Sequence, residues 1–239
     1  MLMKLIFIRH AEPDYSIDSL TEKGWREAEI LSHRVAKWNI KDIYCSPLGR
    51  AKDTASFSLK ALGREAVIHD WLQEFYYLVK DEQTGENTIA WDFMPEYFVS
   101  NTDLHDKDEW YNTKVMKSGE IAGHYAAVVK AFDELLSQHG YRKRKDGVYE
   151  VTEHNDDVLV FFCHFGITSL LTGYLTGIAP PVLWQGFFMA PASVTILGSE
   201  ERIPGEAAFR VQVFGDASHL TEAGEPLSAS GYFTDMFGG

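Results

Sequence analysis

The 239-residue chain is 45% hydrophobic and 24% charged, a composition that supports one globular domain with a sizeable core. Its formal net charge of −13 argues against non-specific binding to nucleic acid or to anionic membranes. The apolar segment 2–8 is too short for a secretory signal and no later run reaches membrane-spanning length, so we expect a cytoplasmic location. Cys45 and Cys163 are too few for a disulfide framework, and each ends an apolar run, which predicts buried, inert thiols.

The first predicted element is a strand, 4–8, that ends at an Arg-His pair. Its continuous apolar run is typical of a parallel strand buried on both faces. Ligands of open α/β sheets bind at the carboxyl ends of the strands, so Arg9 and His10 are placed to meet an anion. A strand that simply emerges into a polar loop is the alternative at this point.

A helix over 22–38 follows, with Thr21 as its N-cap and apolar residues at helical spacing. The segment 40–44 is predicted to be a short strand. Ser46, with proline after it, is predicted to be the N-cap residue of the next helix, which places Arg50 on the first turn of that helix. The Arg50 guanidinium would then point over the same rim, although a surface arginine is the alternative.

The segment 75–119, which follows a short strand at 66–68, shows no sustained period and is predicted to be an inserted cap. It is rich in acidic and aromatic side chains, and the aromatics argue against disorder because they can bury enough area to order the segment. They could line a substrate entrance, or form the small core that the insertion needs. The second interpretation is preferred for most of them.

Regular periodicity returns in a predicted helix, 121–136, closed by Gly140. The segment 141–149 reads as a hairpin with Asp146-Gly147 at its turn. Its basic run, 141–145, could extend a phosphate site, but a solvated hairpin is the commoner explanation.

A second apolar strand, 158–163, repeats the opening pattern and ends at His164. In a parallel sheet His10 and His164 would lie on one rim together with Arg9 and Arg50. A helix over 168–175, strands over 193–197 and 209–214, and a surface tail with little chemical role after Leu220 complete the predicted elements.

These motifs, taken in order, resemble the histidine phosphatase superfamily, which includes the cofactor-dependent phosphoglycerate mutases. The resemblance spans nearly the full length and is carried by four sets of residues: Arg9-His10, Leu20-Thr21 with Gly24, Ser46-Pro47-Leu48-Gly49-Arg50-Ala51, and the late strand-end His164. It implies an α/β fold, a three-layer sandwich with a mixed, mostly parallel sheet flanked by helices. The chain would form a single domain, 1–239, with the aromatic cap 75–119 inserted in it.

The resemblance also implies a metal-independent chemistry without a cofactor. His10 matches the family's nucleophile, and Arg9, Arg50 and His164 are placed to stabilise a transferring phosphoryl group. Glu74 matches the proton donor of the branch that carries its acid before the cap; the other branch has an acid after the second histidine, where this chain has Phe165. Glu12, Asp14 and Glu82 are less favoured acids.

Two departures from the family pattern bear on substrate binding. Phe165 stands where glycine is usual and Ser16 where mutases carry an asparagine that contacts phosphate, and both are candidate substrate-binding residues. Ala11 likewise replaces a glycine. These changes weaken a mutase assignment more than a phosphatase one.

The favoured function is therefore hydrolysis of a small-molecule phosphomonoester through phospho-His10, with no nucleic acid or membrane partner. The alternatives are a phosphoglycerate mutase, a catalytically silent relative that binds a phosphorylated ligand or a protein, and a metal hydrolase using the residues His10, Glu12, Asp14 and His164. The aromatic cap suggests a bulky or apolar substrate, and its exposed aromatics could equally form a homo-oligomer interface.

Overall fold

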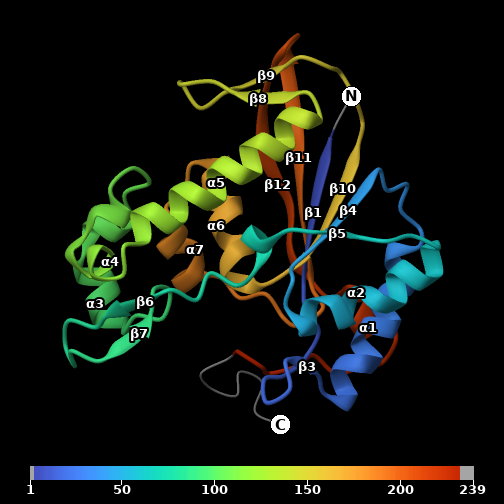
Figure 1. Cartoon of the computed structure of the whole chain (residues 1–239), viewed down its shortest axis with the longest axis horizontal. Helices are drawn as coiled ribbons and strands as arrows, with labels where there is room; N and C mark the ends of the chain where they lie inside the picture. Colours follow the sequence, from blue (N-terminus) through green and yellow to red (C-terminus); the bar gives the residue numbers. More distant parts are fainter. Residues whose placement is uncertain (1–2, 232–239) are drawn as a thin grey trace.

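The computed structural model describes residues 3–231 and is built on an eight-stranded sheet (Figure 1). The strand order is β5-β4-β10-β1-β11-β12-β9-β8. In chain order these strands are β1 (Lys4–Arg9), β4 (Asp42–Cys45), β5 (Val67–Ile68), β8 (Tyr141–Lys143), β9 (Tyr149–Val151), β10 (Val158–Cys163), β11 (Val194–Ile203) and β12 (Glu206–Asp216). Two small sheets pair β2 (Pro13–Asp14) with β3 (Ser19–Leu20) and β6 (Leu78–Lys80) with β7 (Asn87–Ile89).

The large sheet is mixed, with a parallel region around β1. Strands β5, β4, β10 and β1 pair in parallel, whereas each pairing from β1 through β11, β12 and β9 to β8 is antiparallel. Among the described residues, β11 and β9 therefore run against the other six strands. This confirms the predicted mixed, mostly parallel sheet.

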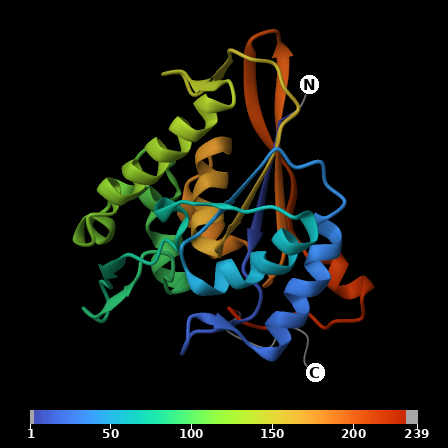
Figure 2. The same ribbon diagram turned by 45° about the vertical axis from the view of Figure 1, so that its right-hand side comes forward.

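Helices cover both faces of the sheet (Figures 1 and 2). One face carries α1 (Glu22–Val35), α2 (Gly49–Leu62) and the short α8 (Ser218–Glu222). The other carries α5 (Ile121–Gln138), α6 (Phe165–Thr176) and α7 (Pro180–Gly186). The three-layer α/β architecture expected from the sequence is confirmed.

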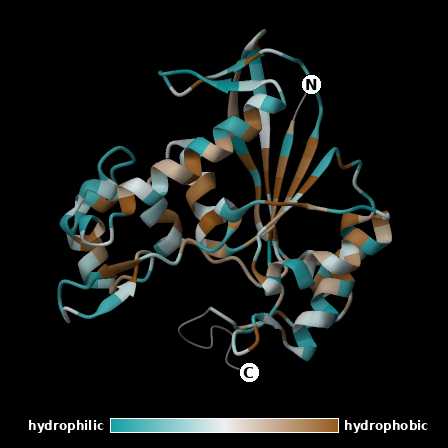
Figure 3. Ribbon diagram, in the orientation of Figure 1, coloured by the Kyte–Doolittle hydropathy of each residue, from teal (hydrophilic) through white to brown (hydrophobic). Residues whose placement is uncertain are grey.

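Strand β1 contributes to both hydrophobic cores because alternate side chains of a strand point to opposite faces. Ile6 and Ile8 pack on the side of α1 and α2, while Leu5 and Phe7 pack on the side of α5 and α6. All four are at most 3% exposed. In Figure 3 the central strands are coloured mainly as apolar, in agreement with the burial of β1 on both faces. Burial on both sides makes the end of β1 a fixed platform.

The parallel register brings three chain segments to one rim. Arg9 of β1 pairs with Cys163 of β10, and Phe162 of β10 pairs with Cys45 of β4. The next residues, His10, His164 and Ser46, therefore leave the sheet side by side at its carboxyl end. Both cysteines are free and buried, and burial raises the pKa of each thiol to about 12, as expected for inert thiols.

Helix α1 begins where the sequence predicted, and its cap is formed by Thr21. The Thr21 hydroxyl accepts a hydrogen bond from the backbone N–H of Gly24 at 3.0 Å, which satisfies one of the helix's free amide groups. The helix ends at Val35, three residues before the predicted boundary, and residues 36–37 continue it only as a turn.

The prediction that Ser46 caps the next helix was wrong. Residues 47–48 form a bend, α2 begins at Gly49, and Leu48 is its N-cap residue. The carboxylate of Asp18 accepts a hydrogen bond from the Gly49 N–H at 2.7 Å and so caps the helix from a distant loop. Arg50 nevertheless lies on the first turn, as predicted. Helix α6 also begins earlier than predicted, at Phe165, directly after His164.

The segment 75–119 folds into short elements on the side of α5: the β6–β7 hairpin, α3 (Pro95–Ser100), the 3-10 turns η2 (Thr102–His105) and η3 (Trp110–Asn112), and α4 (Lys114–Ser118). Trp110 is fully buried and Phe93 is 5% exposed, so the segment contributes its own aromatic core. Tyr76 and Trp91 instead line a cavity. Its role as a cap, and the single-domain division, stay predictions.

The helix and hairpin predicted after this segment are confirmed. Helix α5 is followed by Gly140, whose φ of +81° is a left-handed conformation that favours glycine. The β8–β9 hairpin lies at the opposite end of the sheet from the carboxyl ends of β1 and β10 (Figure 1). The basic run 141–145 is therefore not part of the rim, and Arg144 pairs with Asp146 and Glu206 instead.

The last two predicted strands are present but longer than expected, since β11 and β12 form an extended antiparallel pair. Across residues 3–231, none of the helices has the length and apolar character needed to cross a membrane. The cytoplasmic location and a homo-oligomeric state stay predictions.

Candidate active site

The site is built on His10, which follows β1 and is held by the backbone on both sides. Its N–H donates to the Cys163 carbonyl at 2.9 Å, and its own carbonyl accepts from the Ala192 N–H at 3.1 Å. The side chain is buried, with 2% of the residue exposed. Its neighbour Arg9 is also buried, so a charged group and an imidazole are both presented at the end of one rigid strand.

The hydrogen bond of the His10 ring fixes which nitrogen is free. Nδ1 lies 2.8 Å from the carbonyl oxygen of Ala11, which can only accept, so Nδ1 carries the hydrogen. Burial lowers the pKa of His10 well below its ordinary value, and the adjacent Arg9 lowers it further. The ring is therefore neutral at pH 7 with its lone pair on Nε2, the form that a nucleophile requires.

His164 lies beside His10, with ring centroids 5.2 Å apart. It directly follows β10 and is the N-cap residue of α6, so it stands at the positive end of that helix. Its Nε2 is 2.7 Å from the Ser46 hydroxyl, and its Nδ1 is buried without a hydrogen-bond partner among the described residues. Burial lowers the pKa of His164 well below its ordinary value, with His10 as the next cause.

Two guanidinium groups flank these rings. Arg9 donates to the carbonyls of Met189 and Ser230 and lies 5.8 Å from the centre of the Phe188 ring. Burial lowers the pKa of Arg9, but a guanidinium keeps its charge at neutral pH. The two nearby cations also explain why both histidines resist protonation.

Arg50 is the second guanidinium, and it is oriented by the loop that precedes α1. Its Nη1 donates to Asp18 at 2.6 Å, and the group lies 5.3 Å from the centre of the Tyr15 ring. Its Nε is buried without a partner among residues 3–231, as is the Nε of Arg9. Arg9 Nε, Arg50 Nε and His164 Nδ1 are thus three buried polar atoms without a hydrogen-bond partner among residues 3–231, and a bound anion with several acceptor oxygens could supply partners for such groups.

Glu74 is the acid of the site. Its Oε1 accepts hydrogen bonds from the backbone N–H groups of Phe75 at 2.9 Å and Ile167 at 3.1 Å. A Cβ on Gly166 would lie 2.6 Å from the same oxygen, so only glycine permits this approach. Burial raises the pKa of Glu74 although Arg9 and the backbone N–H groups oppose the shift. The carboxyl group can therefore hold a proton at a higher pH than an exposed glutamate.

A cavity of about 490 Å³ opens onto these groups. Arg9, Arg50, Glu74 and Phe165 line it, and the rest of its wall is largely aromatic, formed by Tyr15, Tyr76, Ile89, Trp91, Trp184, Gln185, Gly186, Phe187, Phe188 and Gly231. His10 and His164 are not among the lining residues, but His10 follows Arg9 in the chain, His164 precedes Phe165, and the charges of Arg9 and Arg50 act on both rings. The structure thus brings together five residues predicted to be catalytic and Phe165.

Ser16 is not brought to the cavity. It lies in an exposed loop, and its hydroxyl donates to Asp14 at 2.6 Å. The less favoured acids are also engaged elsewhere: Glu12 bonds Thr21 and Ser228, and Glu82 pairs with Lys114. Within residues 3–231, no group of three or more histidine, cysteine or acidic side chains is arranged to hold a metal ion.

Sequence reasoning missed several residues of the site. Ser46 was interpreted as a helix cap, whereas its hydroxyl positions His164. Asp18 carries no local motif, since its contact with Arg50 depends on the folded loop. The tail after Leu220 was expected to have little chemical role. That expectation was wrong for the part of the tail that the structure describes, because the Ser230 carbonyl contacts Arg9 and Gly231 lines the cavity. The remainder of the tail, 232–239, lies outside the described residues.

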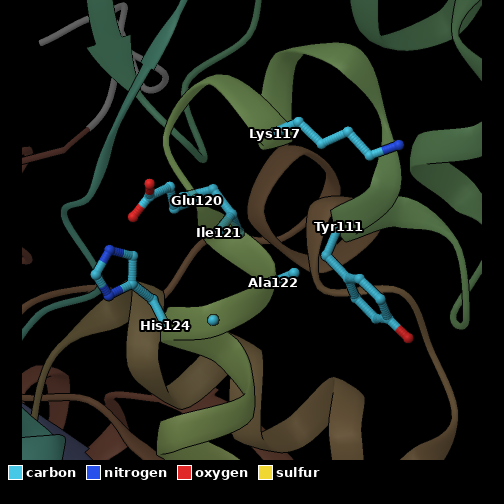
Figure 4. Close-up of a pocket in the computed structure, with 7 residues that line it drawn as sticks. Tyr111, Lys117, Glu120, Ile121, Ala122 and His124 are labelled. Atoms are coloured by element: carbon cyan, nitrogen blue, oxygen red, sulfur yellow. The ribbon is translucent and has the colours of Figure 1, made fainter.

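Two other cavities contain none of the predicted site residues. One, of about 320 Å³, lies at the amino end of α5, where the side chains of Lys117, Glu120 and His124 point in different directions (Figure 4). The other, of about 500 Å³, is lined in part by Asp42 and His139. The candidate active site is therefore the cavity next to His10.

The family model described as histidine phosphatase superfamily (branch 1) matches residues 5–207. A curated relative, the 2,3-bisphosphoglycerate-dependent phosphoglycerate mutase of Thermoplasma acidophilum, is 34% identical over 79 residues, which cover 29% of this chain and 40% of that enzyme. The match thus spans less than half the length of that relative.

Solved structures share the fold at low identity. The mycobacterial glucosyl-3-phosphoglycerate phosphatase has a TM-score of 0.60 at 18% identity, with 91% of this chain and 100% of that chain covered. The phosphoserine phosphatase of Entamoeba histolytica, in complex with 3-phosphoglyceric acid, has a TM-score of 0.56 at 20% identity, covering 91% and 99%. With the family match over most of its length, the chain belongs to the histidine phosphatase superfamily, branch 1.

Proposed function

We propose that this protein is a phosphatase that hydrolyses a phosphomonoester through a phosphohistidine intermediate on His10. The observation that carries the proposal is the neutral His10 ring, whose Nδ1–H is held by the Ala11 carbonyl so that Nε2 has a free lone pair. A neutral nucleophile is suited to a phosphomonoester because it adds no negative charge to a dianionic group.

In the first step, His10 Nε2 attacks the phosphorus atom and the bond between phosphorus and the ester oxygen breaks. The electron pair of that bond passes to the leaving oxygen, which takes a proton from Glu74. The raised pKa of Glu74 favours the protonated form needed for this step. Arg9, Arg50 and His164 balance the charge that spreads over the equatorial phosphoryl oxygens.

In the second step, the Glu74 carboxylate accepts a proton from a water molecule that attacks the phosphohistidine. The phosphorus–nitrogen bond breaks, its electron pair returns to Nε2, and inorganic phosphate leaves. Glu74 is then protonated again, so the two steps form a closed cycle. The two guanidinium groups supply the positive charge that a phosphoryl transfer requires, which is why we propose a metal-independent reaction.

Phosphatases among the structural neighbours and the family membership support this proposal. A phosphoglycerate mutase is the second candidate, because the curated relative carries that activity. Such an enzyme must hold a second acidic group of its substrate and shield the phosphohistidine from water. The described cavity residues include only two cations, Arg9 and Arg50, which favours the phosphatase.

The test is hydrolysis of p-nitrophenyl phosphate in excess EDTA by wild type, His10→Ala and the matched control His33→Ala. His33 is an exposed histidine on α1. We expect turnover by wild type and the control, and loss of at least about 10³-fold in His10→Ala. Turnover by His10→Ala at the wild-type rate, or loss of activity on chelation, would refute the proposed mechanism. Isomerisation of phosphoglycerate only with a bisphosphoglycerate primer would instead establish the mutase.

A further inference from the structure

The wall of the catalytic cavity is aromatic on several sides. Within residues 3–231, seven aromatic side chains line it, and they come from the loop before α1, from the segment 75–119, from α6 and α7, and from the residues after α7. These residues are Tyr15, Tyr76, Trp91, Phe165, Trp184, Phe187 and Phe188. The aromatic surface is therefore a property of the cavity and not of one apolar element.

Much of this wall is fixed in place. Trp91 Nε1–H donates to the Phe75 carbonyl at 2.7 Å, and the Trp91 ring packs edge-on against Phe165 with centroids 5.7 Å apart. Trp184 Nε1–H donates to the Gly166 carbonyl at 2.9 Å and stacks on Phe75. With both indole N–H groups bonded away, these rings offer apolar faces and edges to a bound group. A preformed wall requires little ordering on binding.

The charges of the cavity are confined to its catalytic groups. Among the described lining residues the cations are Arg9 and Arg50, and the acid is Glu74. The other side chain with a strong polar group beyond the tyrosines is Gln185, whose amide donates to the Trp91 carbonyl at 2.9 Å. A carboxylate on the alcohol part of a substrate would lose water on entry without gaining a cation of its own.

The mouth of the cavity is also apolar. Phe187 is 47% exposed and Tyr76 is 50% exposed, and both line the cavity. Phe187 is supported by an edge contact with Phe214, whose ring centroid lies 5.1 Å away. An aromatic or bulky apolar group that enters between these rings would remove their surface, and its own, from water.

We propose that the site is selective for phosphomonoesters of aromatic or bulky apolar alcohols and discriminates against phosphorylated carboxylic acids. This selectivity rests on the proposed phosphatase function. Arg9, Arg50 and the two histidines hold the phosphoryl group, and the aromatic wall holds the alcohol. Phe187 and Gln185 determine selectivity, since one supplies apolar surface and the other stands where a cation would be needed to bind a carboxylate.

The experiment compares kcat/KM for three esters of aliphatic alcohols, so that leaving-group reactivity does not set the order: 2-phenylethyl phosphate, ethyl phosphate and phosphoserine. We expect 2-phenylethyl phosphate to exceed ethyl phosphate by about 30-fold, the effect of burying one aromatic ring. Phosphoserine is expected to be no better than ethyl phosphate. Equal values for the two uncharged alcohols, or a preference for phosphoserine, would overturn the selectivity.

Substitutions of single lining residues test whether the aromatic wall causes the preference for 2-phenylethyl phosphate. Phe187→Ala is expected to reduce the ratio of 2-phenylethyl to ethyl phosphate by about fivefold or more, whereas Val99→Ala, at an exposed apolar residue outside the lining, leaves it unchanged. Gln185→Arg is expected to raise kcat/KM for phosphoserine by about tenfold through the added cation. A ratio that Phe187→Ala does not alter would refute its role.

Failure of the selectivity and failure of the proposed function give different results. Hydrolysis of all three esters with similar kcat/KM would overturn the selectivity alone and leave the phosphatase intact. No hydrolysis of any ester, with no phosphate transferred to the protein, would refute the phosphatase and with it the selectivity.

Discussion

The hydroxyl of Ser46 lies 2.7 Å from Nε2 of His164, and this contact joins the ends of two neighbouring parallel strands. Ser46 also accepts a hydrogen bond from the Leu48 N–H at 3.3 Å. The second nitrogen of His164, Nδ1, is thereby left to face another partner. In the proposed mechanism Ser46 is a positioning residue, because it would act on a phosphoryl group only through the orientation of His164.

Replacing Ser46 by alanine is expected to reduce kcat/KM for p-nitrophenyl phosphate by about tenfold, the effect of one hydrogen bond to a functional ring. Ser46→Thr, which keeps the hydroxyl, is expected to restore most of the activity. Ser56→Ala on the exposed side of α2 is the control. If alanine and threonine reduce activity equally, the hydroxyl does not position His164.

The loss of activity caused by Glu74→Gln is expected to depend on the leaving group of the substrate. The amide keeps an acceptor for the Phe75 and Ile167 N–H groups but has no proton to give. Hydrolysis of ethyl phosphate should fall by about 10²–10⁴-fold in kcat/KM, whereas p-nitrophenyl phosphate, whose leaving group is stable as an anion, should lose far less. Because the second step also needs the carboxylate, the variant should show a burst of p-nitrophenol followed by slow turnover. Equal losses for both esters would remove Glu74 from the role of proton donor.

The same variant is expected to become more stable relative to wild type as the pH rises. The pKa of Glu74 is raised in the folded protein, so between its ordinary pKa and the raised one the unfolded chain releases a proton that the folded chain keeps. Stability is therefore lost as the pH rises through this window, and Glu74→Gln avoids the loss. The Tm difference between variant and wild type should be larger at pH 8 than at pH 4, and Glu29→Gln at an exposed position is the matched control. A difference independent of pH would contradict the raised pKa.

His219 is expected to contribute to instability in acid. Burial, with Arg34 as the next cause, lowers the pKa of His219 to about 4, and its Nδ1 accepts a hydrogen bond from Arg34 at 3.1 Å. Between pH 6.5 and 4 the unfolded chain binds a proton that the folded chain does not, so stability falls as the pH falls. His219→Asn should flatten this fall by up to about 1.4 kcal/mol per pH unit in urea unfolding. An unchanged slope would show that His219 takes up its proton without unfolding.

Two glycine-to-alanine substitutions are expected to have opposite effects on stability, because one glycine lies against the backbone of a loop and the other has open space around it. A Cβ on Gly49 would lie 2.0 Å from the Asp18 carbonyl oxygen, next to the contact that orients Arg50, whereas a Cβ on Gly123 in α5 would meet nothing within 4 Å. Gly49→Ala is expected to reduce the unfolding free energy by about 2 kcal/mol or more and to reduce activity. Gly123→Ala should stabilise the protein by about 0.5–1 kcal/mol. Equal effects in chemical denaturation would contradict the packing around Gly49.

The main residues of the site were predictable because they follow strands that are buried on both faces. Such strands have a strong apolar signal, and the rule that parallel strands end at one rim places Arg9, His10 and His164 together. The position of Arg50 was predictable because it lies on the first turn of the helix that follows the neighbouring parallel strand β4. Glu74 depended on the family resemblance, since no local pattern marks it out.

The remaining contacts depend on tertiary structure that local patterns do not contain. Ser46 has the sequence of an N-cap, but Asp18 caps α2 instead, and Asp18 reaches it from a loop in which its own φ is +48°. Helix α6 begins directly at Phe165 because His164 is already its N-cap residue. The approach of Ser230 to Arg9 joins residues 221 positions apart, which no local pattern reveals.

The measurement that tests the central claim most directly is a rapid-quench experiment with an excess of ³²P-labelled substrate, followed by peptide mapping by mass spectrometry. We predict a phosphoenzyme that is labile in acid and stable in base, as a phosphoramidate is, with the label on His10 and no label in His10→Ala. A label on His164, an acid-stable label, or turnover without any phosphoenzyme would contradict the account.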